Sequence, residues 1–246
     1  MSGEALLKRF PKTRPALSAE IAAIYQRQYI ENRNGDTRAS SIAQKVEAWM
    51  HRKVAADLAA GGAGPTLELG AGSLNQLDFE PVAPDYDIVE PFSELFAGSA
   101  HRARVRDVFA DVAQVPADRR YRRITSIAAL EHICDLPPAL ARAARLLADD
   151  GALRAAIPSE GGLLWALGWK LTTGLEFRLR HGLDYGELMR HEHVNTAAEI
   201  EGLLKALFAD VRIESFGIGR QLSLYRFIVA RRPRLDVAQA WLDRYA

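Results

Sequence analysis

The chain has 246 residues, a formal net charge of +1 and a hydrophobic fraction of 48%, which fits one large globular domain or two small ones. The balance of 32 basic against 31 acidic residues argues against a general nucleic-acid binder, because such proteins are normally basic overall. The single cysteine, Cys134, excludes an internal disulfide and a zinc site built on several cysteines. The sequence shows neither the apolar run of a signal peptide nor the roughly 18–20 apolar residues of a membrane span. We therefore expect a soluble, cytoplasmic protein.

The first 62 residues predict an N-terminal helical arm. Apolar residues recur at intervals of three and four over 18–32 and again over 37–60, which is the spacing of amphipathic helices. Ser18 is a candidate N-cap for the first helix, and the run Gly-Gly-Ala-Gly-Pro at 61–65 ends the second.

From residue 63 to 232 the pattern changes to short apolar runs that alternate with helical segments. The expected strands cover 66–69, 86–89, 103–105, 124–127, 152–157, 211–216 and 222–230, and the expected helices cover 91–99, 137–148 and 196–208. This alternation predicts βαβ units and a mostly parallel sheet. The connection between the last two strands is too short for a parallel crossover, so we expect an antiparallel hairpin at the sheet edge. Residues 159–194 predict an insertion over the active face, and 233–246 a helical tail.

A glycine-containing turn directly follows the first expected strand. The segment 67–75 reads Leu-Glu-Leu-Gly-Ala-Gly-Ser-Leu-Asn, and glycines after a strand let the backbone turn sharply and approach a ligand closely. Glu90 ends the next strand, 20 residues after Gly70, where a carboxylate can accept hydrogen bonds from ribose hydroxyls. Asp107 ends the third expected strand and should lie on the same rim. The alternative is a tight turn with solvated acids at strand ends.

The residues around this turn bear on the kind of cofactor. A dinucleotide site has the pattern G-x-G-x-x-G, with the pyrophosphate at a helix N-terminus. Here Asn75 stands at the third glycine position, and Glu68 lies two residues before Gly70. A carboxylate beside the loop disfavours a pyrophosphate and suits the ammonium or sulfonium group of S-adenosylmethionine (SAM).

These residues resemble the motifs of the class I SAM-dependent methyltransferases. Glu-Leu-Gly-Ala-Gly at 68–72, Glu90 and Asp107 resemble the first three motifs, 124–133 resembles the fourth, and 136–158 resembles the helix, turn and strand that follow. The resemblance covers residues 63–232. It implies a Rossmann-like α/β fold with a seven-stranded, mostly parallel sheet, one antiparallel edge strand and helices on both faces.

The resemblance also implies roles for individual residues. Glu68, Gly70 and Gly72 would hold the methionine portion of the cofactor, with Asn75 beside them in the cofactor loop. Glu90 would bind the ribose hydroxyls. Asp107 and Val108 would face the adenine, and Ala129 and Leu130 would line the floor beneath the sulfonium.

Two histidines are candidates for catalysis. His132 follows the fourth strand, where it can act as a general base near neutral pH; the alternative is that it only packs beside the cofactor. The pair Glu131-His132 also resembles the ubiquinone-pathway O-methyltransferases, which use a metal and have another Glu three positions before the Glu. Because Ala128 occupies that position, we expect no metal site. In the run His-Glu-His at 191–193, His193 or His191 is expected to line the acceptor pocket, with His193 assisting His132; the alternative is a solvated loop before the helix that begins near Asn195.

The sequence therefore predicts a SAM-dependent methyltransferase that acts on a hydroxyl or amine of a small molecule or glycan, in a bacterial polysaccharide or secondary-metabolite pathway. Two alternatives remain: an NAD-type oxidoreductase, and a non-catalytic SAM-binding scaffold. The apolar stretch that contains Trp165 and Trp169 predicts a lid packed on the core. Its other interpretation is peripheral membrane contact with a lipid-linked acceptor.

Overall fold

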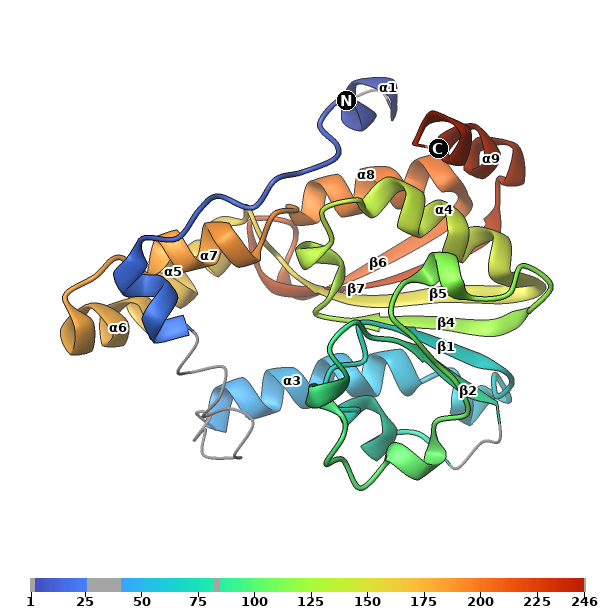
Figure 1. Cartoon of the computed structure of the whole chain (residues 1–246), viewed down its shortest axis with the longest axis horizontal. Coiled ribbons are helices and arrows are strands. Elements are labelled where there is room, and N and C mark those ends of the chain that lie inside the picture. The colour runs from blue at the N-terminus through green and yellow to red at the C-terminus, as the bar shows by residue number, and fades with distance from the viewer. Residues whose placement is uncertain (1–2, 26–40, 82–84, 246) are drawn as a thin grey trace.

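A seven-stranded sheet runs through the centre of the computed structural model, which describes residues 3–25, 41–81 and 85–245 (Figure 1). The strands are β1 (Thr66–Leu69), β2 (Tyr86–Val89), β3 (Val108–Phe109), β4 (Tyr121–Ile127), β5 (Leu147–Pro158), β6 (Phe208–Ile218) and β7 (Leu222–Pro233). Their order across the sheet is β3-β2-β1-β4-β5-β7-β6. The predicted α/β fold with seven strands is confirmed.

The first five strands are parallel to one another, and β7 runs antiparallel to both β5 and β6. The predicted hairpin at the sheet edge is therefore correct. Its antiparallel strand lies one position inside the edge, however, because β6 occupies the edge itself. The chain order reverses between β1 and β4, and open α/β sheets bind ligands outside the carboxyl ends of the strands at such a point.

Helices cover both faces of the sheet. They are α1 (Gly3–Leu7), α3 (Ser41–Ala55), α4 (Leu136–Leu146), α5 (Leu163–Leu171), α6 (Thr173–His181), α7 (Tyr185–Glu192), α8 (Ala197–Leu207) and α9 (Leu235–Arg244). Side chains alternate between the two faces of a strand, so Leu153 and Ala155 of β5 join the main core under α4 and α8. Ala156 points the other way and packs against Met50 and Val54 of α3.

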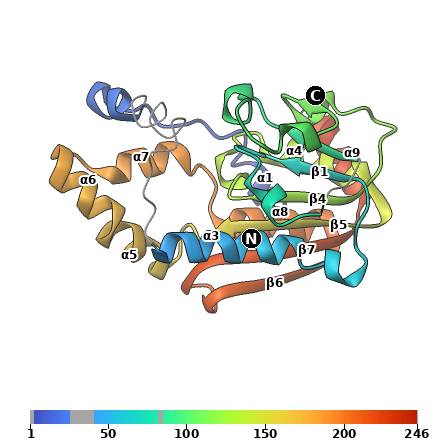
Figure 2. The ribbon, with the colours of Figure 1, turned by 90° about the horizontal axis from the view of Figure 1, so that it is seen from below.

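The insertion at 159–194 folds into α5, α6 and α7, which we call the lid. Figures 1 and 2 show these helices extending beyond one end of the sheet, after β5 and before α8. The expected tail forms α9. Among the described residues, no helix is both long and apolar enough to span a membrane.

Two expected elements differ from the structure, and a third lies partly outside the described residues. The strand predicted at 103–105 is wrong: residues 102–104 form a 3₁₀ turn, and β3 comes later, where Val108 and Phe109 pair with β2. The apolar Val105, which suggested a strand, is buried in the core beside β2 without being part of a strand. The helix expected at 91–99 shrinks to the 3₁₀ turn Ser93–Leu95. Of the helix expected at 18–32, residues 19–25 are helical, and 26–32 lie outside the described residues.

Candidate functional site

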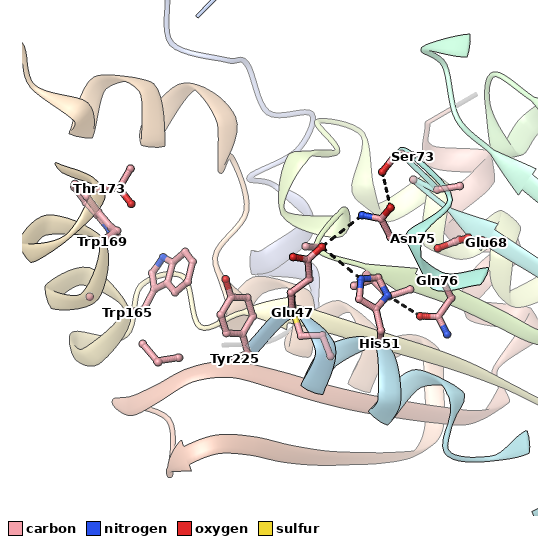
Figure 3. Close-up of a pocket in the computed structure, with 18 of the residues that line it drawn as sticks. Glu47, His51, Glu68, Ser73, Asn75, Gln76, Trp165, Trp169, Thr173 and Tyr225 are labelled. Carbon is pink, nitrogen blue, oxygen red and sulfur yellow. Dashed lines mark hydrogen bonds and ion pairs between the residues drawn. The ribbon is translucent and has the colours of Figure 1, made fainter. Parts of the chain in front are cut away.

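Two cavities meet at the turn after β1. The first, which we call the Glu90 cavity, has a volume of about 730 Å³ and is lined by residues that follow β1, β2, β3 and β4. The second, the Trp165 cavity, has a volume of about 930 Å³ and lies between this turn, α3 and the lid (Figure 3). Gly70, Gly72 and Ala128 line both. A molecule in one cavity can therefore come into contact with a molecule in the other.

The turn itself depends on Gly70. Its backbone has a φ of +70°, in the left-handed region that favours glycine. A Cβ built on Gly70 would lie 2.4 Å from Cβ of Ala129, the residue that begins the turn after β4. The two turns thus approach so closely that a side chain at position 70 does not fit. Gly72 has a φ of +51°, and a Cβ there would meet nothing within 4 Å, so this residue borders open space.

Glu90 lies directly after β2 with its carboxylate held in place at the cavity wall. Oε2 accepts a hydrogen bond from the backbone N–H of Gly72 at 2.9 Å, and Oε1 accepts one from Phe92 at 3.0 Å. A carboxylate has about four lone-pair positions, so acceptor capacity remains on both oxygens. The arrangement fixes this carboxylate against the glycine turn and suits recognition of paired hydroxyls.

Glu68 and Asn75 both line the Trp165 cavity rather than the Glu90 cavity. Glu68 is buried, and its Oε2 accepts a hydrogen bond from the Tyr86 hydroxyl at 2.8 Å. Burial raises the pKa of Glu68 to about 8, although the Tyr86 hydrogen bond opposes the rise. The expected full negative charge beside the loop is therefore weakened at neutral pH. Asn75 accepts a hydrogen bond from the Ser73 hydroxyl at 2.9 Å.

The expected positions of Asp107 and Val108 at the ligand-binding edge are wrong. Asp107 precedes β3, and its Oδ2 accepts a hydrogen bond from Arg119 at 2.6 Å, near the amino end of β4. Val108 lies within β3 and packs against the core beside β2. The acid that follows β3 is Asp111, and it lines the Glu90 cavity together with Val112. Sequence reasoning missed it because a two-residue strand is too short to show a periodic pattern.

The turn after β4 divides its residues between the cavity and the core. Ala129 lines the Glu90 cavity as expected, and so does His132. Leu130, which was expected beside them, is instead fully buried in the main core under α4. A leucine at the first position of the short 3₁₀ helix Leu130–His132 anchors that turn to the core, and this leaves the smaller Ala129 at the surface of the cavity.

The two candidate histidines, 61 residues apart in the sequence, lie side by side with ring centroids 5.0 Å apart. Nδ1 of His132 lies 2.9 Å from the Glu192 carbonyl oxygen, and Nδ1 of His193 lies 2.8 Å from Oε2 of Glu160. Both partners can only accept, so both Nδ1 atoms carry the proton. Burial lowers the pKa of His132, and the neighbouring His193 lowers it further. In the neutral ring the Nε2 atom is then an acceptor.

Glu160 joins this pair of histidines to the lid. Its Oε2 also accepts a hydrogen bond from Nε1 of Trp165 at 2.7 Å, and the Trp165 ring stacks on His193 with centroids 6.0 Å apart. Burial alone would raise the pKa of Glu160, but the hydrogen bonds from His193 and Trp165 outweigh it and hold the pKa below its ordinary value. An ionised Glu160 thus orients His193 and Trp165. Trp165 lines a cavity, but His193, which was expected at the acceptor pocket, is not among the described residues that line either one; His191 lines the Glu90 cavity instead.

Two residues that position the site could not be predicted from the sequence. Each donates hydrogen bonds to backbone carbonyls of distant segments, and no motif marks such contacts. The buried Asn195 donates from Nδ2 to the carbonyls of Leu130 at 2.9 Å and Ile133 at 2.7 Å. Arg14 donates to the carbonyl of His132 at 2.9 Å and to that of His191 at 2.8 Å. These contacts tie the end of α7 to the turn after β4, so the lid and the histidines are held in one arrangement.

The wall of the Trp165 cavity is aromatic and acidic. Trp165 and Trp169 come from the lid and Tyr225 from β7, and Figure 3 shows these rings opposite the glycine turn. Three glutamates line it, Glu47, Glu68 and Glu176; among the described residues, no lysine or arginine does. Aromatic faces and carboxylates favour a neutral or cationic guest.

Comparison with known proteins gives the fold a family context. No protein-family model matches the chain, and no curated protein matches it by sequence. A solved structure of a plantazolicin methyltransferase, BpumL, in complex with a monoazolic desmethylPZN analogue and SAH, superposes with a TM-score of 0.56 at 12% identity, over 86% of this chain and 92% of that one. A SAM-dependent methyltransferase from Thermotoga maritima, described as a possible histamine N-methyltransferase, gives a TM-score of 0.51 at 15% identity over 75% and 90%.

A possible exported protein from Bordetella parapertussis also matches, with a TM-score of 0.51 at 17% identity over 74% of this chain and 67% of that one. At these identities the likeness concerns the fold. The strand order, the reversal between β1 and β4 and the antiparallel β7 agree with that likeness. The chain has the Rossmann-like fold of the class I SAM-dependent methyltransferases.

Proposed function

We propose that the protein is a SAM-dependent methyltransferase that acts on a hydroxyl or amine of a small molecule or glycan, in a bacterial polysaccharide or secondary-metabolite pathway. The observation that carries the proposal is the pair of cavities that share Gly70, Gly72 and Ala128 as a common wall. A methyl transfer needs two molecules to meet end to end, and this arrangement gives each its own chamber and one point of contact.

The residues of the Glu90 cavity fit the cofactor. The Glu90 carboxylate keeps free acceptor capacity for the ribose hydroxyls, and Asp111 and Val112 are placed for the adenine. The open space at Gly72 and the close approach at Gly70 form a cradle without side chains for the methionine portion. When bound, SAM supplies an electrophilic methyl group on a sulfonium. The chain then has to orient the acceptor and remove its proton.

We infer that His132, assisted by His193, accepts the proton. Nδ1 of each ring faces an acceptor, so the neutral His132 ring presents Nε2 as a base toward the Glu90 cavity that it lines, and His193 packs beside it. An acceptor hydroxyl needs this base. An acceptor amine in its neutral form needs only orientation, and Glu47 and Glu176 of the Trp165 cavity would attract it as a cation before it loses its proton.

Two other functions make different predictions. An NAD-type oxidoreductase would place a pyrophosphate at the glycine turn, where the Glu90 carboxylate, which is bonded to the backbone N–H of Gly72, would repel it. A non-catalytic scaffold would bind SAM without transferring its methyl group.

Calorimetric titration with SAM, S-adenosylhomocysteine and NAD separates these functions, followed by transfer of labelled methyl from SAM to a panel of amines, sugars and phenols. We expect SAM and S-adenosylhomocysteine to bind and NAD not to bind, and we expect Glu90→Ala to lose both binding and transfer. Binding of NAD without SAM would refute the proposal. Tight SAM binding with no transfer to any acceptor would favour the scaffold.

A further inference from the structure

Three side chains with metal-ligating atoms converge beside the Glu90 cavity. Glu131 and His132 follow β4, and His193 follows α7; one ligand atom from each lies within 4.8 Å of those from the other two. We propose that Glu131, His132 and His193 form a binding site for one divalent transition-metal ion. The site itself needs only these residues, and its catalytic role rests on the function proposed above.

The two histidines are already oriented as metal ligands. A histidine that binds a metal normally donates its other ring N–H to a carboxylate or a backbone carbonyl, which fixes the tautomer and the ring plane. His132 donates to the Glu192 carbonyl and His193 donates to the Glu160 carboxylate, both through Nδ1. In the neutral form of each ring, Nε2 therefore presents its lone pair.

Glu131 supplies the third ligand and an independent reason to expect a cation. Its side chain is only 1% exposed, and Oε2 has no hydrogen-bond partner among the described residues. Buried polar atoms nearly always have a partner, so an orphaned carboxylate oxygen calls for an explanation. Oε1 lies 3.8 Å from Nε2 of His132, too far for a hydrogen bond. A cation between these atoms would satisfy both oxygens and both rings.

The donor set indicates the class of ion. One carboxylate and two imidazoles suit Zn²⁺, Fe²⁺ or Co²⁺ rather than Mg²⁺ or Ca²⁺, which prefer oxygen ligands. With metal–ligand bonds of about 2.0–2.2 Å, ligand atoms in a tetrahedron lie about 3.4 Å apart. The three atoms here would have to move together by about 1 Å. Because the His132 side chain is 32% exposed at the cavity, its ring has room for this movement.

Three protein ligands leave at least one position of the ion open. Ala128 lies three residues before Glu131 and offers no fourth ligand. His132 lines the Glu90 cavity, which shares Ala128 with the Trp165 cavity, so an acceptor hydroxyl would have to reach past this shared wall to occupy the open position. An ion there would lower the pKa of an acceptor hydroxyl and hold its oxygen, and this points to hydroxyl acceptors. The two histidines would then act as ligands rather than as the base.

Metal binding can be measured without knowledge of the acceptor. Untagged protein stripped with EDTA is titrated with Zn²⁺ by calorimetry, and the Co²⁺ form is examined for the intense visible bands of a four- or five-coordinate ion. We expect one ion per chain. Glu131→Gln and His193→Ala should each weaken binding at least tenfold, and Glu160→Gln, which removes the second contact of His193, should weaken it by about 10–100-fold. His101→Ala is the control, since His101 pairs with Asp78 away from both cavities.

The outcomes separate this inference from the proposed function. Absence of stoichiometric binding, or binding that survives Glu131→Gln and His193→Ala in folded protein, overturns the metal site. Loss of binding in His101→Ala overturns it as well. One bound ion that is lost in both ligand variants supports the site even if no methyl transfer is found, in which case only the proposed function fails. Methyl transfer that is unchanged after EDTA treatment would show that the histidines work without an ion.

Discussion

Replacement of Gly70 by alanine tests the close approach of the two turns on which the site depends. The new Cβ would lie 2.4 Å from Cβ of Ala129, about 1 Å closer than an ordinary contact, and the backbone would hold alanine at a φ of +70°. The left-handed backbone costs roughly 1–2 kcal/mol and the overpacking about 1–3 kcal/mol. We expect a loss of about 2–5 kcal/mol in the free energy of unfolding. We also expect at least a tenfold loss of affinity for S-adenosylhomocysteine, because the turn must move.

A second substitution separates the clash from the backbone strain. Ala129→Gly removes the atom that the new methyl group meets, so Gly70→Ala/Ala129→Gly should recover most of the lost affinity while the strain at residue 70 remains. Gly182→Ala is the matched control, since Gly182 has a φ of +71° at the end of α6 with nothing within 4 Å. It should lower stability by about 1–2 kcal/mol without any change in affinity. Calorimetric titration and thermal melts measure both quantities. Wild-type affinity in Gly70→Ala, or no recovery in the double variant, would refute the reasoning.

Three further predictions follow from the positions of individual residues. Asp111→Asn should weaken SAM binding, whereas Asp107→Asn should leave it unchanged and lower stability, because only Asp111 lines the Glu90 cavity; the opposite pattern in calorimetry would refute the corrected assignment. Burial raises the pKa of Glu68 from 4.5 to about 8, so the wild type should lose stability as the pH rises from 5 to 8 while Glu68→Gln does not. The difference in the free energy of unfolding between the wild type and Glu68→Gln, measured by denaturant unfolding, should change by about 3 kcal/mol over this pH range. A difference that stays constant with pH would contradict the raised pKa of Glu68. If the lid touches membranes, the exposed Leu171 and Leu179 should carry the contact, and their double replacement by glutamate should abolish co-sedimentation with anionic vesicles; a wild type that does not sediment would exclude such contact.

The parts of the site that the sequence predicted well are those in which local pattern decides the structure. The strand Thr66–Leu69, the glycines after it and Glu90 after the next strand are each marked by residue type within a few positions. Parallel strands bring their carboxyl ends to one edge, so these residues had to meet. Asp107 failed because its placement depended on a third strand that is only two residues long. The position of that third strand, β3, is set by its pairing with β2 and not by the pattern of its own residues.

The histidines also show that contacts between distant segments decide positions that local pattern leaves open. His191 and His193 cannot be distinguished by spacing, because both flank Glu192 in an exposed-looking run. The structure distinguishes them through the end of α7: His191 still lies in the helix and contacts the Pro15 carbonyl through Nδ1, whereas His193 is the first residue beyond it and turns to Glu160.

Glu160 lies where His193 can reach it because of the sheet order. β4 and β5 are adjacent and parallel, so the residues that follow them, Glu131 and Glu160, emerge at the same edge. Glu131 is left with an oxygen that has no partner in the described part of the chain, and Glu160 orients His193. The cluster is therefore a consequence of strand order together with the point at which one lid helix ends, and a change that extended α7 by one residue would separate His193 from both carboxylates.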